Sequence, residues 1–368
     1  MSSLASSQSL GRGGLLRRLV DPLVDQAIVD FWLGQLNRLW TWERPLARVV
    51  ERRQEAADAV TLLLKPNRHW QGFRAGQHLN IGAEVNGRCV TRSYSLSDQP
   101  RPDGLIVITV KQVPGGLLST QLCDRTQVGD ILTIGQAYGD LALPKTGKGG
   151  YLLLAAGSGI TPLMSLIRSW AAAGGESRLT LAYWARTKEQ LCFAKELQAL
   201  AEAQPRFRLH LLLTQHPATP AARIGAAPLD ALLLDAAAVA DLHVLACGPG
   251  GFVETARQLL ASRVAGFQAE AFSPATPLRV DEVRPVTVQL QRSGRSLTIS
   301  SGDSLLGALE AQGLRPASGC RMGICHSCVC TKLEGQTQNL LTAEQDGEPG
   351  SALRLCVSRA CGNISLDL

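Results

Sequence analysis

The stretch CRMGICHSC, residues 320–328, decides the fold of the C-terminal part of the chain. It sets Cys320, Cys325 and Cys328 in the pattern C-x4-C-x2-C, and Cys356 follows farther along. This is the spacing of the four thiolate ligands of a [2Fe–2S] cluster, for which one tight loop supplies three thiolates and a distant segment supplies the fourth. The sequence therefore predicts a [2Fe–2S] cluster in this part of the chain.

The residues around the motif favour a cluster over the alternative, a structural zinc site. Gly319 and Gly323 allow the loop to fold close over the cluster sulfides with its backbone N–H groups pointing inward. Zinc motifs usually pair two short C-x2-C units, a pattern that this segment does not have. Cys330 and Cys361 do not fit the ligand spacing, so we interpret them as packing residues.

Residues 284–368 resemble the plant-type ferredoxins, which implies an α+β domain of the β-grasp kind. The predicted elements are a hairpin of residues 286–290 and 296–299, a helix over residues 303–312, the cluster loop, and a closing strand over residues 363–368. The resemblance implies that the iron ligands are Cys320, Cys325, Cys328 and Cys356.

The pattern of apolar residues predicts two further domains upstream. Residues 46–145 contain short alternating strands separated by turns, which predicts an antiparallel β-barrel. Residues 146–273 alternate apolar strands with helical stretches, which predicts an α/β domain with a parallel sheet. Residues 274–283 are interpreted as a linker and residues 1–45 as a partly helical leader. The strands expected in the α/β domain are Tyr151–Ala156, Arg178–Trp184, Phe207–Leu213 and Leu242–Cys247.

The barrel segment carries two motifs that suit a flavin nucleotide. In RSYS, residues 92–95, Arg92 can neutralise a phosphate and Tyr94 can cover a flavin ring. Gly115 and Gly116 lead into an expected helix start, where backbone N–H groups can face a phosphate. Neither motif is specific alone, because an ordinary strand with a surface arginine has the same sequence.

The α/β segment carries two motifs at the ends of expected strands, where open α/β sheets bind ligands. In AAGSGITP, residues 155–162, the glycines permit close approach of a pyrophosphate to a helix N-terminus. Thr161 is expected to be the N-cap of that helix and Pro162 its first residue. The segment differs from a GxGxxG motif because Pro stands at the place of the last Gly. The second motif is CGPGG, residues 247–251.

Taken in order, these motifs resemble the ferredoxin–NADP reductase superfamily over about residues 46–273. For the flavin, the resemblance implies that Arg92 and Tyr94 hold its phosphate and its ring and that Ser95 forms a hydrogen bond near its N5 atom. The residues implied to contact the flavin phosphates are Gly115, Gly116 and Ser119. Glu270 and Phe272 resemble the acid and the aromatic residue that lie near the flavin at the end of this unit.

For the nicotinamide cofactor, the resemblance implies a site in the α/β segment with Cys247 beside the hydride path. The residues implied to support the cofactor are Gly157, Gly159, Thr161, Pro162, Gly248 and Pro249. After the second expected strand the chain has Arg186 and Lys188 and no acid to bind the ribose 2′-OH of NADH. Two cations suit a 2′-phosphate, so the sequence favours NADPH, with NADH and a solvated loop as the alternatives.

The combined domains predict an NAD(P)H-dependent oxidoreductase, an electron-transfer reductase that carries electrons from NADPH through FAD to the [2Fe–2S] cluster and on to a partner protein. The expected partner is a membrane fatty-acyl desaturase or an oxygenase. The reductase of a Rieske oxygenase or of a hybrid-cluster protein is the close alternative. A non-enzymatic redox sensor or zinc-binding adaptor is the alternative of another class. The contacts do not distinguish FAD from FMN.

The composition of the chain and the pattern of its leader indicate where in the cell the protein is expected. The net charge of +6 is too small to indicate nucleic-acid binding, and neither a signal peptide nor a run of about 18 apolar residues is present, so a cytoplasmic protein is expected. Within residues 23–42 one helical side carries Val24, Ile28, Phe31, Trp32 and Leu39, and Trp40 and Trp42 follow. This side can pack on the barrel, which the pattern favours, or touch an inner membrane face or a membrane-bound partner. The leader resembles that of bacterial reductases serving fatty-acyl desaturases.

Overall fold

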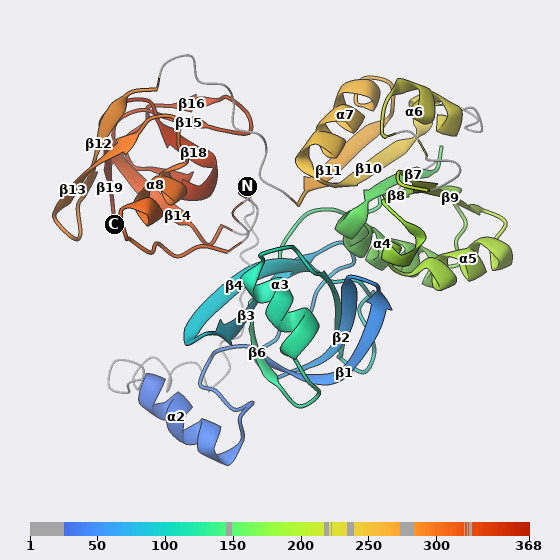
Figure 1. The fold of residues 1–368 in the computed structure, drawn as a ribbon, viewed down its shortest axis with the longest axis horizontal. Coiled ribbons are helices and arrows are strands. Elements are labelled where there is room, and N and C mark those ends of the chain that lie inside the picture. The colour runs from blue at the N-terminus through green and yellow to red at the C-terminus, as the bar shows by residue number, and fades with distance from the viewer. Residues whose placement is uncertain are drawn as a thin grey trace, which may run out of the picture.

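The computed structural model describes residues 26–144, 149–216, 221, 223–233, 239–272, 283–319, 321, 323 and 326–368. A short helix, a β-barrel, an α/β domain and a C-terminal domain follow one another along the chain (Figure 1). The predicted fold class is confirmed: an antiparallel barrel, a parallel-sheet domain and an α+β domain. In the described part of the chain no helix has both the length and the apolar composition needed to cross a membrane.

The barrel consists of six antiparallel strands in the order β4-β3-β6-β1-β2-β5. A bridge between Leu96 and Ile108 joins its two ends. Alternate side chains such as Leu62 and Leu64 fill the interior, and Leu122 from a short helical cap closes it. The strands are β1 (Leu46–Ala56), β2 (Ala59–Pro66), β3 (His78–Val85), β4 (Arg88–Ser95), β5 (Ile106–Lys111) and β6 (Ile131–Ile134), and the cap is α3 (Leu117–Thr120) with η1 (Gln121–Arg125).

The α/β domain has five parallel strands in the order β11-β10-β7-β8-β9. Helices α4 and α5 cover one face and α6 and α7 the other, and the α4 face shares a core with Ala56, Ala59 and Leu141 of the barrel. The strands are β7 (Tyr151–Ala156), β8 (Leu179–Ala185), β9 (Phe207–Leu213), β10 (His243–Gly248) and β11 (Gly266–Ala271). The helices are η2 (Gly157–Gly159), α4 (Ile160–Ala172), η3 (Lys188–Gln190), α5 (Ala194–Ala203), α6 (Ala226–Leu233), η4 (Val239–Asp241) and α7 (Gly250–Leu260). The edge strand β11 was not expected, because its half-buried sequence GFQAEA lacks an apolar run.

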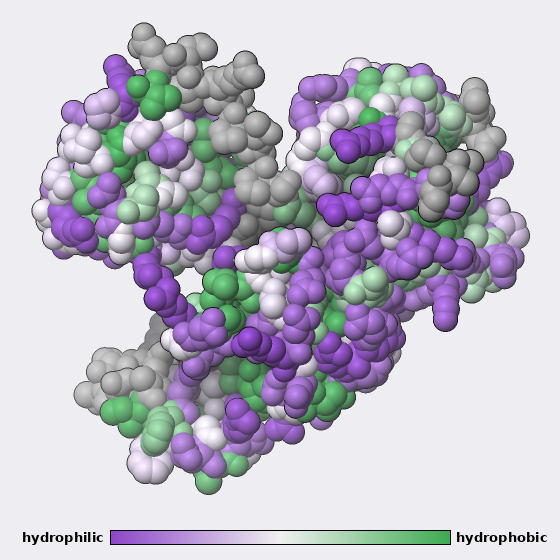
Figure 2. Space-filling view, in the orientation of Figure 1, coloured by the Kyte–Doolittle hydropathy of each residue, from purple (hydrophilic) through white to green (hydrophobic). Residues whose placement is uncertain are grey.

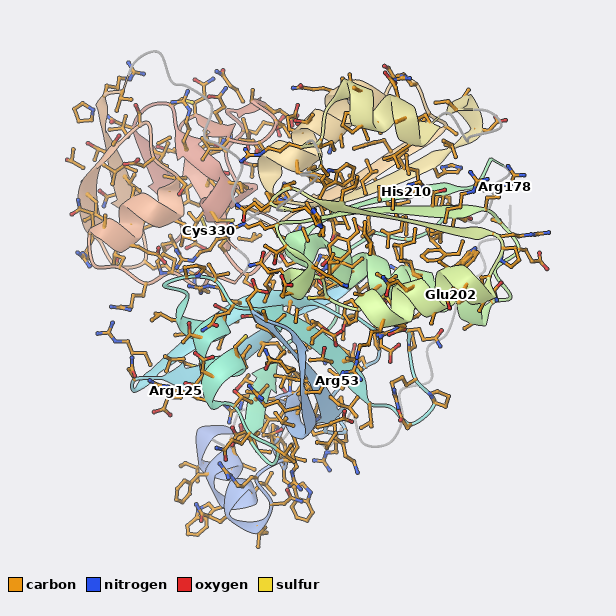
Figure 3. The ribbon with its side chains drawn as sticks, turned by 45° about the vertical axis from the view of Figure 1, so that its right-hand side comes forward. Arg53, Arg125, Arg178, Glu202, His210 and Cys330 are labelled. Atoms are coloured by element: carbon orange, nitrogen blue, oxygen red, sulfur yellow. The ribbon has the colours of Figure 1, made fainter. Side chains whose placement is uncertain are left out.

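The C-terminal domain combines a five-stranded mixed sheet, β13-β12-β19-β14-β17, with a three-stranded sheet, β16-β15-β18, and one helix. The helix begins after Ser304, whose hydroxyl accepts a hydrogen bond of 3.2 Å from the Gly307 N–H. Cys330 (labelled in Figure 3) is buried in the core of this domain, in agreement with a packing role. The elements are β12 (Pro285–Leu290), β13 (Arg295–Ser300), α8 (Leu305–Ala311), β14 (Val329–Glu334), β15 (Thr337–Asn339), β16 (Gln345–Asp346), β17 (Ser351–Arg354), η5 (Leu355–Val357), β18 (Ser358–Ala360) and β19 (Ile364–Leu366).

The leader helix α2 (Gln26–Leu36) does not bury its apolar side, so the expectation that it packs on the barrel is wrong for the described residues. The side chains of Ile28, Phe31, Trp32, Leu36 and Trp40 are all more than half exposed, and Val24 lies outside the described residues. Apolar side chains appear in green beside the lower end of the barrel in Figure 2. Within the leader, Asp30 accepts hydrogen bonds from the Trp42 N–H at 2.6 Å and from Arg44 Nε at 2.7 Å. Hydrogen bonds between the leader and the barrel segment start from the residues after α2: Asn67 Nδ2 donates to the Leu39 carbonyl at 3.1 Å, and His69 Nε2 lies 2.9 Å from the Thr41 carbonyl.

Candidate active site

A cavity of about 470 Å³ lies where the barrel meets the α/β domain, within the size range of small-molecule sites. Strand β4, the glycine turn before α3, the start of α4 and the residue after β11 form its wall. It brings together the following residues expected to hold a flavin: Arg92, Tyr94, Ser95, Gly115, Gly116, Ser119 and Phe272. Thr161, expected at the nicotinamide cofactor, also lines this cavity.

The chemistry of the cavity wall suits a flavin nucleotide. Burial lowers the pKa of the half-buried Arg92 from its usual value, and Arg321 of the C-terminal domain lowers it further. Burial raises the pKa of Tyr94 well above its usual range, so this ring is a neutral, mostly apolar surface. Gly115 has a φ of 73°, a conformation that favours glycine, and a Cβ on Gly116 would collide with the Ser119 hydroxyl. This turn therefore requires both glycines.

The start of α4 differs from the expectation. The single turn η2 precedes it, so Gly159 is already helical (φ −59°, ψ −14°) and occupies the N-cap position. Thr161 lies in the first turn of the helix, where its hydroxyl donates a hydrogen bond of 2.9 Å to the Ser158 carbonyl. Thr161 is therefore not the N-cap. Pro162 is not the first residue either, but it still falls among the four helix positions whose N–H groups lack a partner within the helix.

A second and wider cleft, of about 1280 Å³, lies beside the carboxyl ends of β7 and β8. Of the residues expected to bind the nicotinamide cofactor, Gly157, Arg186 and Pro249 line it. Lys188, in η3, is absent from that wall, and Arg223 lines it instead. Sequence reasoning missed Arg223 because it belongs to no motif and reaches the cleft only through the fold. Gly159 and Gly248 have a packing role, since a Cβ on either would overlap backbone or side-chain atoms of the facing turn.

A buried pair of titratable groups stands at the inner end of the flavin cavity. His78 Nε2 lies 3.4 Å from Glu270 Oε1, and His78 lines the cavity. Burial lowers the pKa of His78 to about 4, and burial, with a smaller contribution from Asp140, raises the pKa of Glu270 to about 8. Cys247, next to Glu270 across β10 and β11, is fully buried, and burial raises its pKa. All three groups are thus neutral at neutral pH. Sequence reasoning missed His78 because it is a single histidine on a strand and belongs to no motif.

Glu270→Gln should flatten the pH dependence of stability between about pH 7.5 and 8, an interval above both the folded pKa of His78, about 4, and its ordinary value of 6.5. Glu270 has a pKa of about 8 when folded and 4.5 as its ordinary value, so the folded chain retains a proton that the unfolded chain releases. Stability therefore falls as pH rises through this interval, by up to about 1.4 kcal/mol per pH unit. Glutamine does not titrate. Thermal melts of both proteins across this range test the effect, and two parallel curves would contradict it.

Two of the four cysteines expected to bind the cluster, Cys328 of the loop and Cys356 of the distant segment, lie among the described residues. Cys328 Sγ and Cys356 Sγ are 3.2 Å apart, much farther than the ~2.05 Å of a disulfide bond, so a loop and a distant segment bring two thiols together with no disulfide between them. Gly323 has a φ of 77°, and its carbonyl accepts a hydrogen bond of 2.5 Å from Arg354. These features fit thiolate ligation of an iron–sulfur cluster. Cys320 and Cys325 lie outside the described residues.

Comparison with known proteins identifies three families, one for the barrel, one for the α/β domain and one for the C-terminal domain. The families described as "Oxidoreductase FAD-binding domain", "Oxidoreductase NAD-binding domain" and "2Fe-2S iron-sulfur cluster binding domain" match residues 47–142, 153–258 and 288–361. An NADPH oxidoreductase of Mycobacterium tuberculosis is 32% identical over 96% of this chain and 92% of its own. A glycine betaine monooxygenase reductase subunit of Chromohalobacter salexigens is 28% identical over 89% and 96%. The structure of phthalate dioxygenase reductase matches with a TM-score of 0.60 and 28% identity over 88% and 97%.

The cofactor expectations are therefore confirmed: the protein is an oxidoreductase that uses FAD, a nicotinamide cofactor and a [2Fe–2S] cluster for electron transfer. The similarity extends along nearly the whole chain and through all three domains. This chain belongs to the ferredoxin–NADP reductase-type oxidoreductases that carry a C-terminal 2Fe–2S domain.

Proposed function

We propose that this chain is the reductase component that takes electrons from NADPH and supplies them to an oxygenase. The observation that carries the proposal is that the flavin cavity and the nicotinamide cleft share wall residues, among them Gly115, Ser158 and Phe272. A nicotinamide ring placed in the cleft therefore has direct access to a flavin in the cavity. A bound flavin would accept two electrons at once as a hydride and release them one at a time.

In this proposal the side chains bind and orient rather than react. Arg92 neutralises a flavin phosphate, Tyr94 covers the ring, and Ser95 is placed near N5 at the buried end of β4. Phe272 lines both cavities and so keeps water away from the path of the hydride, whereas Cys247 is fully buried and lines neither of them. The hydride step requires no acid or base from the protein.

For NADPH, the proposal assigns the 2′-phosphate to Arg186 and Arg223. We expect Arg186→Ala and Arg223→Ala each to raise the KM for NADPH about tenfold or more, with little effect on NADH, because each removes one charge-assisted phosphate contact. Lys188→Ala is the matched control and should change neither value. Steady-state kinetics with a dye acceptor measures all three. Equal effects on both cofactors would refute the assignment.

The acceptor is proposed from the relatives, several of which are named as reductases of a monooxygenase or a dioxygenase. The test is reconstitution of substrate oxidation with purified reductase, NADPH and a terminal oxygenase from the same cell, beside a membrane fraction that contains its fatty-acyl desaturase. Product formation with the oxygenase and none with the desaturase is expected. Product formation with the desaturase and none with the oxygenase would contradict the proposal and identify the desaturase as the acceptor.

We also propose that α2 gives this cytoplasmic reductase a peripheral contact with the inner membrane face. The side chains of Phe31 and Trp32 are exposed, and their rings pack edge to face with their centroids 5.4 Å apart. Exchange of both for serine should weaken binding to phospholipid vesicles by roughly a hundredfold, the loss of two large apolar side chains. Val128→Ser on the barrel, which removes an equally exposed apolar side chain, is the control. Co-sedimentation measures binding. Wild-type protein that never sediments with lipid would eliminate the membrane contact.

A further inference from the structure

A side-chain hydrogen bond joins the barrel to the cluster loop. Asn80 on β3 donates through Nδ2 to the Ser327 hydroxyl at 3.2 Å, and both side chains are half-buried. Ser327 immediately precedes Cys328. The contact therefore bears on the placement of the cluster relative to the flavin domain, an electron-transfer step that comes before delivery to any external acceptor.

The Asn80 amide is held in one orientation by its other partners. Its Oδ1 accepts a hydrogen bond of 2.7 Å from Ser93 Oγ, and the Tyr138 hydroxyl, 3.1 Å from the same Oδ1, donates its one proton either to Oδ1 or to Ser93 Oγ. The backbone is equally fixed, because β3 is paired with β4 on one side and with β6 on the other. With two hydroxyl groups at Oδ1, the amide nitrogen is directed toward Ser327.

The other end of this network is the wall of the flavin cavity. Ser93 lines the cavity between Arg92 and Tyr94. The hydrogen bonds from Ser93 to Asn80 and from Asn80 to Ser327, followed by one peptide bond, thus connect the cavity wall to a cysteine of the cluster motif. Electron tunnelling slows steeply with distance, so a contact that fixes this separation has a direct effect on rate.

Charge attraction is not the source of this docking. Arg321, in the same loop as Ser327, is close enough to Arg92 to lower its pKa, and two guanidinium groups repel each other. Arg321 is instead paired within its own domain with Glu310, at 2.6 and 2.8 Å. The neutral contact between Asn80 and Ser327 opposes this repulsion.

We propose that Asn80 is a positioning residue that seats the cluster loop on the flavin domain through Ser327 and thereby sets the rate of electron transfer from flavin to cluster. Oxidation of the nicotinamide cofactor supplies the electron pair. Each electron that reaches the cluster reduces it by one and oxidises the flavin by one, and the flavin protons pass to solvent. Neither Asn80 nor Ser327 exchanges an electron or a proton itself.

The test is a double-mutant cycle on the full-length holoprotein, with Asn80→Ala, Ser327→Ala and the double variant mixed anaerobically with NADPH in a stopped-flow instrument. Flavin bleaching and cluster reduction are recorded as separate phases. Each single variant should slow the cluster phase by roughly three- to tenfold, as expected for one lost hydrogen bond, and the double variant should be no slower than the slower single. In Ser327→Ala the flavin phase and dye reduction should be unchanged, as should everything in the Ser296→Ala control, an exposed serine of the same domain.

Three results would overturn the proposal: cluster reduction at the wild-type rate, effects of the two substitutions that multiply in the double variant, or a slower phase accompanied by a shifted cluster potential. The potential is therefore measured for each variant by redox titration. Asn80 lies outside the cluster domain. The Asn80→Ala variant therefore still tests the contact if Ser327→Ala fails to assemble its cluster.

Discussion

Cys328→Ser should abolish the iron–sulfur signal of the purified protein while leaving bound flavin and NADPH oxidation by a dye acceptor intact. The buried Cys328 thiol lies beside Cys356, and a serine hydroxyl does not replace a thiolate as a cluster ligand. The flavin cavity and nicotinamide cleft use only residues of the two upstream domains, so they do not require the cluster. Reduction of a protein acceptor should fall to background. Visible and electron paramagnetic resonance spectra, with both activities, measure the result.

Cys361→Ser is the matched control for this substitution. Cys361 is a half-buried free cysteine of the same domain that does not fit the ligand spacing, so its variant should keep a full complement of iron and sulfide. If Cys328→Ser also loses its flavin, the independence of the domains is contradicted. If it retains a normal cluster, the ligand assignment is wrong.

Gly159→Ala should damage the nicotinamide domain severely. A Cβ at this position would overlap the carbonyl group of Cys247 and approach the Gly248 nitrogen to 2.8 Å, so the turn after β7 and the end of β10 would be forced apart. Backbone does not yield as a flexible side chain does, and the expected cost is at least roughly 1–3 kcal/mol of stability. We expect a melting temperature lower by about 4 °C or more and a large loss of NADPH oxidation.

Gly251→Ala separates this effect from the general one of adding a methyl group. Gly251 lies in the first turn of α7, and a Cβ there meets no atom within 4 Å. Its melting temperature should equal or exceed that of the wild type, since alanine favours a helix more than glycine does. Calorimetry of both variants tests the pair. A Gly159→Ala protein as stable as Gly251→Ala would contradict the close packing of the two turns.

The sequence was sufficient to predict the candidate-site residues where their function depends on spacing within a short segment. The cysteine motif, the RSYS strand and the glycine turns are short segments whose chemistry is legible without the fold, and the structure brings Arg92, Tyr94 and Phe272 to one cavity. It was insufficient where residues meet only in three dimensions. Arg223 belongs to no motif, and His78 is a single strand residue. Such partners are set by sheet order and by the packing of one domain on another.

Two errors have definite physical causes. Thr161 has the composition of an N-cap, but the single turn of η2 makes the chain helical before it, and sequence propensity does not register such a turn. The stripe with Phe31 and Trp32 predicts a packed helix, because apolar side chains are usually buried. An apolar pattern does not show whether another element covers it, and here Asp30 ties the helix only to Trp42 and Arg44 of the leader itself.

The central claim, that electrons pass from NADPH through the flavin to the cluster within this one chain, is tested most directly by an anaerobic single-turnover experiment on the full-length holoprotein. Flavin absorbance and the paramagnetic signal of the reduced cluster are followed after mixing with one equivalent of NADPH. We expect flavin bleaching first, then cluster reduction at a rate faster than steady-state turnover, with no other protein present. Flavin that is fully reduced while the cluster stays oxidised would contradict the account.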